Sequence, residues 1–178
     1  MLKPPETIET DRLFLRLLVL EDSEHIFKGY AQDADVTRFL PWRPHPHIEE
    51  TNDFVLRSID SWEEGYSYPW VVICKDINEL IGMIQIRIDN FRADIGYVLA
   101  KAHWGNGFAT EMTTAVVNWA IRQPSIYRVW ATCDVENLAS ARVLEKVGMQ
   151  KEGLLRRYII HPNISTEPRD CFCFSIVK

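Results

Sequence analysis

The chain has 178 residues, of which 47% are apolar and 25% are charged, and its formal net charge at pH 7 is -5. This length and composition suit a single globular domain over residues 1–178 that can bury a substantial core. The negative charge disfavours non-specific binding to nucleic acid and mildly favours cationic ligands such as amines. The sequence has no run of about 18 apolar residues that could cross a bilayer and no apolar block typical of a signal peptide at its start, so we expect a cytoplasmic protein without a membrane segment.

The cysteines and histidines give no signal for a disulfide or a metal site. All four cysteines lie within apolar, strand-like runs, so reduced thiols in the core are expected. Cys171 and Cys173 do not have the spacing of a zinc knuckle. His45 and His47 are separated by one residue, but no further ligand stands at a suitable spacing nearby, so an exposed loop is favoured over a metal site.

The first half of the chain predicts strands with two helices inserted among them. Alternating apolar and polar residues indicate strands over 12–17, 70–74, 80–88 and 93–99. Asp22 and Ser23 offer an N-cap for a first helix, and a second helix is predicted over 48–64 with Gly65 as its stop. The gaps between the last three strands are short enough for hairpins, so these strands should pair antiparallel.

The second half of the chain alternates helices and strands. The predicted elements are a helix from Gly107, a strand over 128–133, a helix from Asn137 to Gly148, and a closing hairpin of strands over 155–160 and 171–177. Such alternation implies a crossover and at least one parallel pair of strands. We therefore predict an α/β (α+β) fold with a mostly antiparallel, mixed sheet of about seven strands flanked by helices.

A glycine loop joins the fourth predicted strand to the helix after it. In Trp104-Gly105-Asn106-Gly107 the two glycines let the backbone approach a ligand closely, and the first N–H groups of the helix are free to bind an anion. A Walker loop is disfavoured because no lysine follows Gly107, and a dinucleotide fingerprint because Thr110 stands where a third glycine or alanine is needed. A plain tight turn is the alternative.

The loop resembles a known motif. The run Trp104-Gly105-Asn106-Gly107-Phe108-Ala109-Thr110-Glu111 is similar to the pyrophosphate loop of the GNAT acyl-CoA N-acyltransferases, which reads Gln/Arg-x-x-Gly-x-Gly/Ala. The leading Trp resembles the branch of the ribosomal-protein N-terminal alanine/serine acetyltransferases, in which Trp-Gly-x-Gly-x-Ala-Thr-Glu is usual. The opening Thr10-Asp11-Arg12-Leu13-Phe14-Leu15-Arg16 and the segment 35–42, which usually lies beside the acceptor opening, resemble the same branch.

A second segment supports this resemblance. The family's second cofactor motif reads Asn-x-x-Ser/Ala followed by Leu/Tyr-Glu-Lys-x-Gly-Phe/Met, and residues 137–149 match it position by position. Two motifs in this order and at this spacing are not explained by a plain turn. The resemblance extends from Thr10 to the last strand, and it implies a GNAT fold that binds acetyl-CoA.

The resemblance also implies a set of cofactor-binding residues. Backbone N–H groups of the loop would hold the pyrophosphate at the favourable end of the helix dipole. The pantetheine arm would lie along the strand edge, where Val98 or Leu99 would offer an N–H group to the thioester oxygen, and Asn137 would hold its other side. The predicted cofactor residues are Val98, Leu99, Trp104, Gly105, Asn106, Gly107, Phe108, Ala109, Thr110 and Asn137.

Two side chains are predicted to transfer protons. Asp94, on the strand face of Val98, corresponds to a glutamate that acts as base in some family members, and it would act through a water because it is shorter. A hairpin-end carboxylate in water is the alternative. The family's usual acid, a tyrosine, is replaced here by Leu144, and Ser140 one turn earlier is the predicted substitute. Ser140 could instead satisfy its own backbone, and a thiolate with a pKa of about 8.5 can leave unaided.

The resemblance, read with these residues, implies an acetyl-CoA-dependent N-acetyltransferase that acts by direct attack of a primary amine in a ternary complex. The N-terminus of a ribosomal or other protein is the favoured acceptor, because an α-amino group has a pKa of about 8 against about 10.4 for lysine. Two alternatives stay open: a modifier of small amines such as drugs, amino acids or polyamines, and an acyl-CoA sensor without turnover. The acceptor loops and the choice between monomer and homodimer are not fixed by the sequence.

Overall fold

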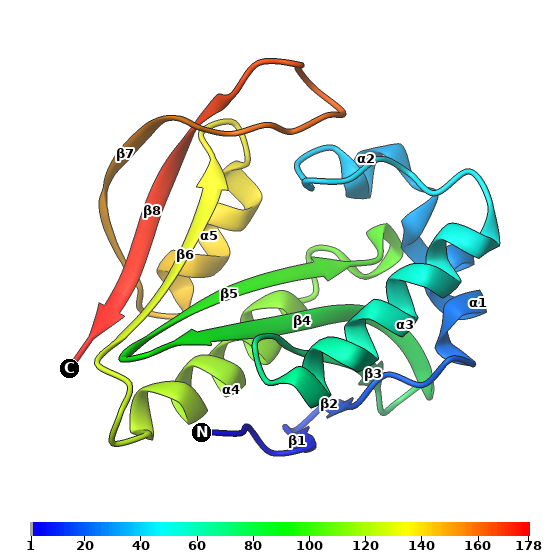
Figure 1. Cartoon of the computed structure of the whole chain (residues 1–178), viewed down its shortest axis with the longest axis horizontal. Coiled ribbons are helices and arrows are strands. Elements are labelled where there is room, and N and C mark those ends of the chain that lie inside the picture. Colours follow the sequence, from blue (N-terminus) through cyan, green and yellow to red (C-terminus); the bar gives the residue numbers. More distant parts are fainter. Residues whose placement is uncertain (1) are drawn as a thin grey trace.

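A computed structural model describes residues 2–178 of the chain (Figure 1). Within these residues, eight strands form one sheet in the order β1-β2-β3-β4-β5-β6-β8-β7. The strands are β1 (Thr7–Glu9), β2 (Leu13–Arg16), β3 (Tyr68–Cys74), β4 (Glu79–Asp89), β5 (Arg92–Leu99), β6 (Arg128–Asp134), β7 (Gln150–Ile159) and β8 (Arg169–Val177). All neighbours pair antiparallel except β5 and β6, which are parallel, so the predicted mixed sheet is confirmed.

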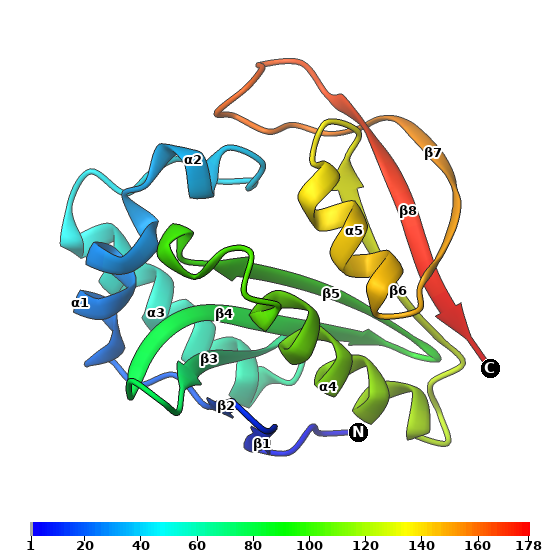
Figure 2. The same cartoon turned by 180° about the vertical axis from the view of Figure 1, so that it is seen from behind.

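Helices cover both faces of this sheet (Figures 1 and 2). The helical segments are α1 (Asp22–Ile26), η1 (Phe27–Ala31), α2 (Ala34–Thr37), α3 (Ile48–Glu64), η2 (Lys101–His103), α4 (Phe108–Arg122) and α5 (Leu138–Lys146). Neighbouring residues of a strand face opposite sides of the sheet, so one strand contributes to two cores. Ile84 packs in the core that contains Met112 of α4, and Met83 packs in the core that contains Ile26 of α1 and Val55 of α3. The two helix layers therefore sandwich the sheet.

The pairing between β5 and β6 creates the gap on which the site depends. Parallel pairing joins residues 92–94 to residues 128–130 and then stops. Both strands continue, β5 to Leu99 and β6 to Asp134, and their facing edges diverge (Figure 1). Unpaired backbone N–H and C=O groups are thus presented inside the molecule, where an extended ligand can pair with them.

The number of strands differs from the prediction of about seven because both outer strands are mostly exposed. β1 has three residues, and β7 begins at Gln150, well before the predicted start at residue 155. Side chains along β7 are exposed almost throughout. Since no face of β7 is buried, its sequence carries no alternating pattern that could mark its start.

Two side chains near the N-terminal helices also differ from the prediction. Asp22 is the first residue of α1 and not its N-cap, because its buried carboxylate pairs with Arg16 (2.7 Å) and accepts the Val19 N–H group (2.9 Å). His45 is buried, with Nδ1 2.8 Å from the Thr51 hydroxyl, and does not lie in an exposed loop. The partners lie only three to six residues away in the chain, but neither the helix period nor the strand period indicates these contacts.

Candidate active site

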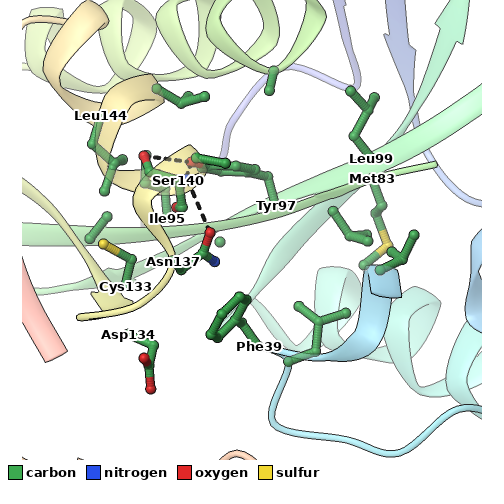
Figure 3. Close-up of a pocket in the computed structure, with 18 of the residues that line it drawn as sticks. Phe39, Met83, Ile95, Tyr97, Leu99, Cys133, Asp134, Asn137, Ser140 and Leu144 are labelled. Carbon is green, nitrogen blue, oxygen red and sulfur yellow. Dashed lines mark hydrogen bonds between the residues drawn. The ribbon is translucent and has the colours of Figure 1, made fainter. Parts of the chain in front are cut away.

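The gap between β5 and β6 opens into a cavity of about 910 Å³ (Figure 3). The glycine loop, the segment 35–42 and His161 of the β7–β8 loop all line the cavity. That loop is tied to the segment by Asn163, which donates to the carbonyls of Thr37 and Trp42 (2.7 Å each). The predicted site residues that line the cavity are Val98, Leu99, Trp104, Gly105, Gly107, Phe108, Ala109, Thr110, Asn137 and Ser140.

The glycine loop forms a cradle of N–H groups on the wall of the cavity. Gly105 and Gly107 have left-handed φ angles of 79° and 80°, which other residues rarely adopt. Gly107 is the N-cap of α4, and its carbonyl accepts the Glu111 N–H group (3.0 Å) as the helix begins. The N–H groups of residues 108–110 are therefore left free at the positive end of the helix dipole, which fits a pyrophosphate.

Arg12 and Glu111 brace this cradle from outside the cavity. The Glu111 carboxylate accepts hydrogen bonds from the Thr10 hydroxyl (2.6 Å) and from the Arg12 main chain (3.0 Å) and guanidinium (2.7 Å). Burial alone would raise the pKa of Glu111, but these hydrogen bonds lower it below its ordinary value, so the carboxylate stays ionised. The Arg12 guanidinium also donates to the Asn106 carbonyl (3.0 Å) and stacks on the Phe108 ring.

Asn106 lies within the loop but differs from its neighbours. It does not line the cavity, and its amide donates to the carbonyls of His103 and Trp104 (3.3 Å each) within the loop. Because the Asn106 carbonyl is held by Arg12, its place in the motif is explained by the shape of the loop. Its side chain and its carbonyl both stabilise the shape of the loop.

The edge of β5 presents two backbone N–H groups to the gap. The Ala100 N–H group donates to a carbonyl on the β4 side (2.8 Å). Alternate residues of a strand direct their N–H groups to the same side, so Val98 also faces β4 whereas Tyr97 and Leu99 face the gap. Of the two residues predicted to supply an N–H group to the thioester, Leu99 faces the gap and Val98 does not. Trp104 fixes the loop to this edge by donating from Nε1 to the Leu99 carbonyl (2.8 Å).

A pair of hydroxyl groups joins β5 to α5 inside the cavity (Figure 3). The Tyr97 hydroxyl lies 2.8 Å from Ser140 Oγ, and Asn137 caps α5 by accepting the Ser140 N–H group (3.1 Å). Burial raises the pKa of Tyr97 above its ordinary value, so its hydroxyl stays protonated and can donate. The sequence indicates Tyr97 first as a strand residue and only second as a site candidate, because its partner Ser140 lies in a distant part of the chain.

Asp94, the predicted base, does not line the cavity. Its carboxylate forms an ion pair with Arg87 of β4, which lies directly opposite in the register, with Arg87 Nε 2.8 Å away. Both contacts are made to one oxygen, Oδ2, and the ion pair draws the carboxylate toward β4. The geometry therefore does not support Asp94 as the group that accepts a proton from a substrate.

A buried charged cluster contributes to another part of the cavity wall. Asp134, the last residue of β6, accepts hydrogen bonds from Arg169 Nε (2.6 Å) and Nη2 (3.1 Å) and from the Glu136 N–H group (2.9 Å). Burial alone would raise the pKa of Asp134, but these bonds lower it, so the carboxylate is ionised. His161 Nε2 lies 3.7 Å from Asp134, and the His161 ring packs edge-on against Phe39. The sequence gives no signal for this cluster beyond an acidic residue that ends an apolar strand.

The described part of the chain offers neither a metal site nor a membrane span. Residues 2–178 contain no group of three or more His, Cys, Asp or Glu that could hold a metal ion, and no helix among them has the length and apolarity needed to cross a bilayer. The four cysteines are free and buried. Burial raises the pKa of Cys133 to about 12 and that of Cys171 to about 11, so both stay as thiols at neutral pH.

The sheet is split between β5 and β6, the start of α4 offers free N–H groups to an anion, and one cavity contains both features. This combination is typical of transferases that hold an elongated phosphorylated carrier between two strands. The chain belongs to the GNAT acetyltransferase family, since the family model for the acetyltransferase (GNAT) domain matches residues 12–150. The protein is thus an acetyl-CoA-dependent N-acetyltransferase, as the sequence predicts.

Relatives with known names support this assignment. The chain is 35% identical to the uncharacterized N-acetyltransferase YoaA of Bacillus subtilis, over 96% of each chain. It is 25% identical to the ribosomal protein uS5 alanine N-acetyltransferase of Escherichia coli, over 88% of this chain and 84% of that protein. Its fold is similar to that of RimL, a ribosomal L7/L12 α-N-protein acetyltransferase solved with CoA, with a TM-score of 0.83, 23% identity and coverage of 97% and 98%.

Proposed function

We propose that the protein acetylates the α-amino group of a protein or peptide N-terminus by direct attack in a ternary complex. The observation that carries this proposal is the cavity, which runs from the N-H cradle along the β5 edge to a wall made by the segment 35–42 and the β7–β8 loop. The donor and the acceptor could therefore meet within one cavity. Two of the relatives are named for acting on a ribosomal-protein alanine and on a ribosomal α-amino group, which supports an N-terminal acceptor.

The residues of the chain suit the two parts of this task. When bound, acetyl-CoA supplies an acetyl thioester, and the N–H groups of residues 108–110 would hold its pyrophosphate. The N–H groups of Tyr97 and Leu99 would pair with the arm and stabilise negative charge on the thioester oxygen. The hydroxyl pair of Tyr97 and Ser140 would donate a proton to the departing sulfur, directly or through water.

A panel of acceptors tests the proposed function. Acetylation would be followed by mass spectrometry with N-terminal alanine and serine peptides, the same peptides blocked at the N-terminus but carrying one lysine, and small amines including a polyamine. We expect kcat/KM at pH 7 to be about 100-fold higher for the free N-terminus than for lysine, because far more of an α-amino group is neutral. Preference for a small amine would replace the acceptor assignment. Binding of acetyl-CoA with no acetylation of any amine would identify a sensor instead.

Removal of either hydroxyl of the pair is expected to lower kcat about tenfold, because general acid catalysis is lost while the thiolate can still leave slowly. The variants are Tyr97→Phe and Ser140→Ala, measured by thiol release, with Tyr127→Phe as the control because Tyr127 is an exposed tyrosine outside the cavity. The double variant should lose little more than either single variant, since the two groups act as one donor. Additive losses, or kcat values equal to that of the control, would contradict the pairing.

A further inference from the structure

His161 is a buried histidine that the hydrogen-bond network leaves free. It is 5% exposed, it lines the cavity, and its ring nitrogens make no close hydrogen bond among residues 2–178, the Leu40 main chain being a weak partner. A buried polar side chain without a partner is costly, so its retention calls for a ligand or a task. Asp134 lies behind the ring at 3.7 Å, and Phe39 packs against it. Figure 3 shows Asp134 and Phe39 on the same side of the pocket, apart from the Tyr97–Ser140 pair.

The other proton acceptors on the cavity wall are accounted for. The histidines and carboxylates that line the cavity within the described residues are Asp35, His103, Asp134 and His161. Asp35 is exposed and paired with Lys101, and Asp134 is held by Arg169 and a main-chain N–H group. His103 lies at the glycine loop, beside the Phe108 ring. Of the two histidines, His161 is the buried one and lies beside a carboxylate.

We propose that His161 accepts the proton of the attacking amine and that Asp134 stabilises the imidazolium ion that results. This inference rests on the proposed function and adds a base on the wall of the cavity, which Asp94 does not line. As the new bond between nitrogen and the acetyl carbon forms, the amine nitrogen gives one proton to His161, and as the bond to sulfur breaks, the sulfur keeps its electron pair and takes one proton from the Tyr97–Ser140 pair. Solvent then takes the proton from His161 and restores the one lost by the pair, so the transfer balances.

The surroundings of His161 suit a base at neutral pH. Burial lowers the pKa of His161, while the Asp134 charge from β6 and the nearby Leu40 main chain raise it and Arg169 from β8 lowers it, with burial the largest effect. The ring is thus neutral at pH 7 and can take up a proton. An ionised carboxylate at 3.7 Å then favours the charged ring once the proton has moved.

Kinetics of His161→Gln against His25→Gln test the inference. His25 is exposed on α1 and does not line the cavity, so its replacement controls for the loss of a histidine. We expect kcat to fall about 100-fold in His161→Gln with the dissociation constant for CoA unchanged, and added imidazole to restore part of the activity of His161→Ala. Below the pKa of His161, the slope of log kcat/KM against pH should be about two in the wild type, where both His161 and the amine must lose a proton. In His161→Gln it should be about one, because only the amine must lose a proton. If His161→Gln acetylates with the kcat and the slope of the wild type, the inference about His161 is wrong while the proposed function stands.

A titration without any acceptor gives a second readout. The imidazole signal of His161, assigned by its loss in His161→Gln, would be followed by NMR with and without CoA. We expect a pKa below the ordinary value of 6.5, and a further decrease in Asp134→Asn. A pKa of His161 at or above 6.5, or one that is the same in the wild type and in Asp134→Asn, would overturn the inference. If the wild-type protein acetylates no amine, the proposed function fails, and this titration still decides whether the His161–Asp134 pair has the required properties.

Discussion

Replacing Gly107 with valine is expected to weaken the binding of CoA about 10- to 100-fold, as measured by isothermal titration calorimetry. A residue other than glycine at a φ of 80° costs about 1–2 kcal/mol, and a main-chain relaxation would turn the helix-start N–H groups away from the phosphates. Hydrogen bonds to charged groups are worth about 1.5–3 kcal/mol each, so losing one or two of them accounts for the expected range. A Cβ at this position would meet only Arg12 Nη2, at 3.5 Å, so the effect comes from the backbone and not from a clash.

Gly65→Val is the matched control for this experiment. Gly65 also has a φ of 80°, but it ends α3 and does not line the cavity. Both variants should lose a similar amount of thermal stability, and only Gly107→Val should lose affinity for CoA. Equal affinities in the two variants would show that the loop is a plain turn.

Replacing Asp134 with alanine is expected to lower the free energy of unfolding by about 1–3 kcal/mol, because it leaves a main-chain N–H group without its buried partner and leaves Arg169 paired with Glu136 alone. Urea denaturation followed by fluorescence would measure this change. Glu24→Ala is the control, since Glu24 forms an exposed ion pair with Lys28 that should contribute little. A loss no larger than that of the control would mean that the cluster is not a buried ion pair in solution.

The same carboxylate gives the stability a pH dependence with a definite sign. The folded-state pKa of Asp134 is lowered from the ordinary 3.8, so its contribution is fully present above that value and is lost as the pH falls through the lower folded-state pKa. The difference in unfolding free energy between the wild type and Asp134→Ala should therefore shrink only in strong acid. A difference that already disappears between pH 5 and pH 7, where the carboxylate is ionised in both states, would be inconsistent with this ion pair.

The elements that the sequence predicts best are those with a strong local signal. The helix over 48–64 is confirmed at both ends, because its apolar stripe is regular and Gly65 adopts the left-handed conformation that stops it. The glycine loop and the Asn137 cap are local in the same sense, and the structure places both motifs on the wall of one cavity. Local motifs therefore indicate the cofactor end of the site.

The acceptor end depends on contacts between distant parts of the chain, which no local pattern shows. Asp94 follows the family pattern, but it pairs through one carboxylate oxygen with Arg87, the opposite residue in the register, and does not line the cavity. His161 lies in an irregular loop and comes near Asp134 only after β6 and β8 have paired. The Tyr97–Ser140 pair likewise joins a strand to a helix across the gap.

The split between β5 and β6 explains why one site can serve two substrates. If β5 and β6 paired along their whole length, β6 would engage the N–H groups of Tyr97 and Leu99. No gap would then continue from the N–H groups at the start of α4. Because the strands separate after residue 94, the cradle, the free edge and the acceptor wall belong to one cavity. We therefore expect acetyl-CoA to occupy this gap.

A crystal structure with CoA bound tests that claim most directly. We predict that the pyrophosphate lies against the N–H groups of residues 108–110, that the arm pairs with the free edge of β5 between Leu99 and Tyr97, and that the sulfur lies near the Ser140 hydroxyl. A CoA molecule bound outside the gap, or one with its phosphates remote from Gly107, would contradict the account.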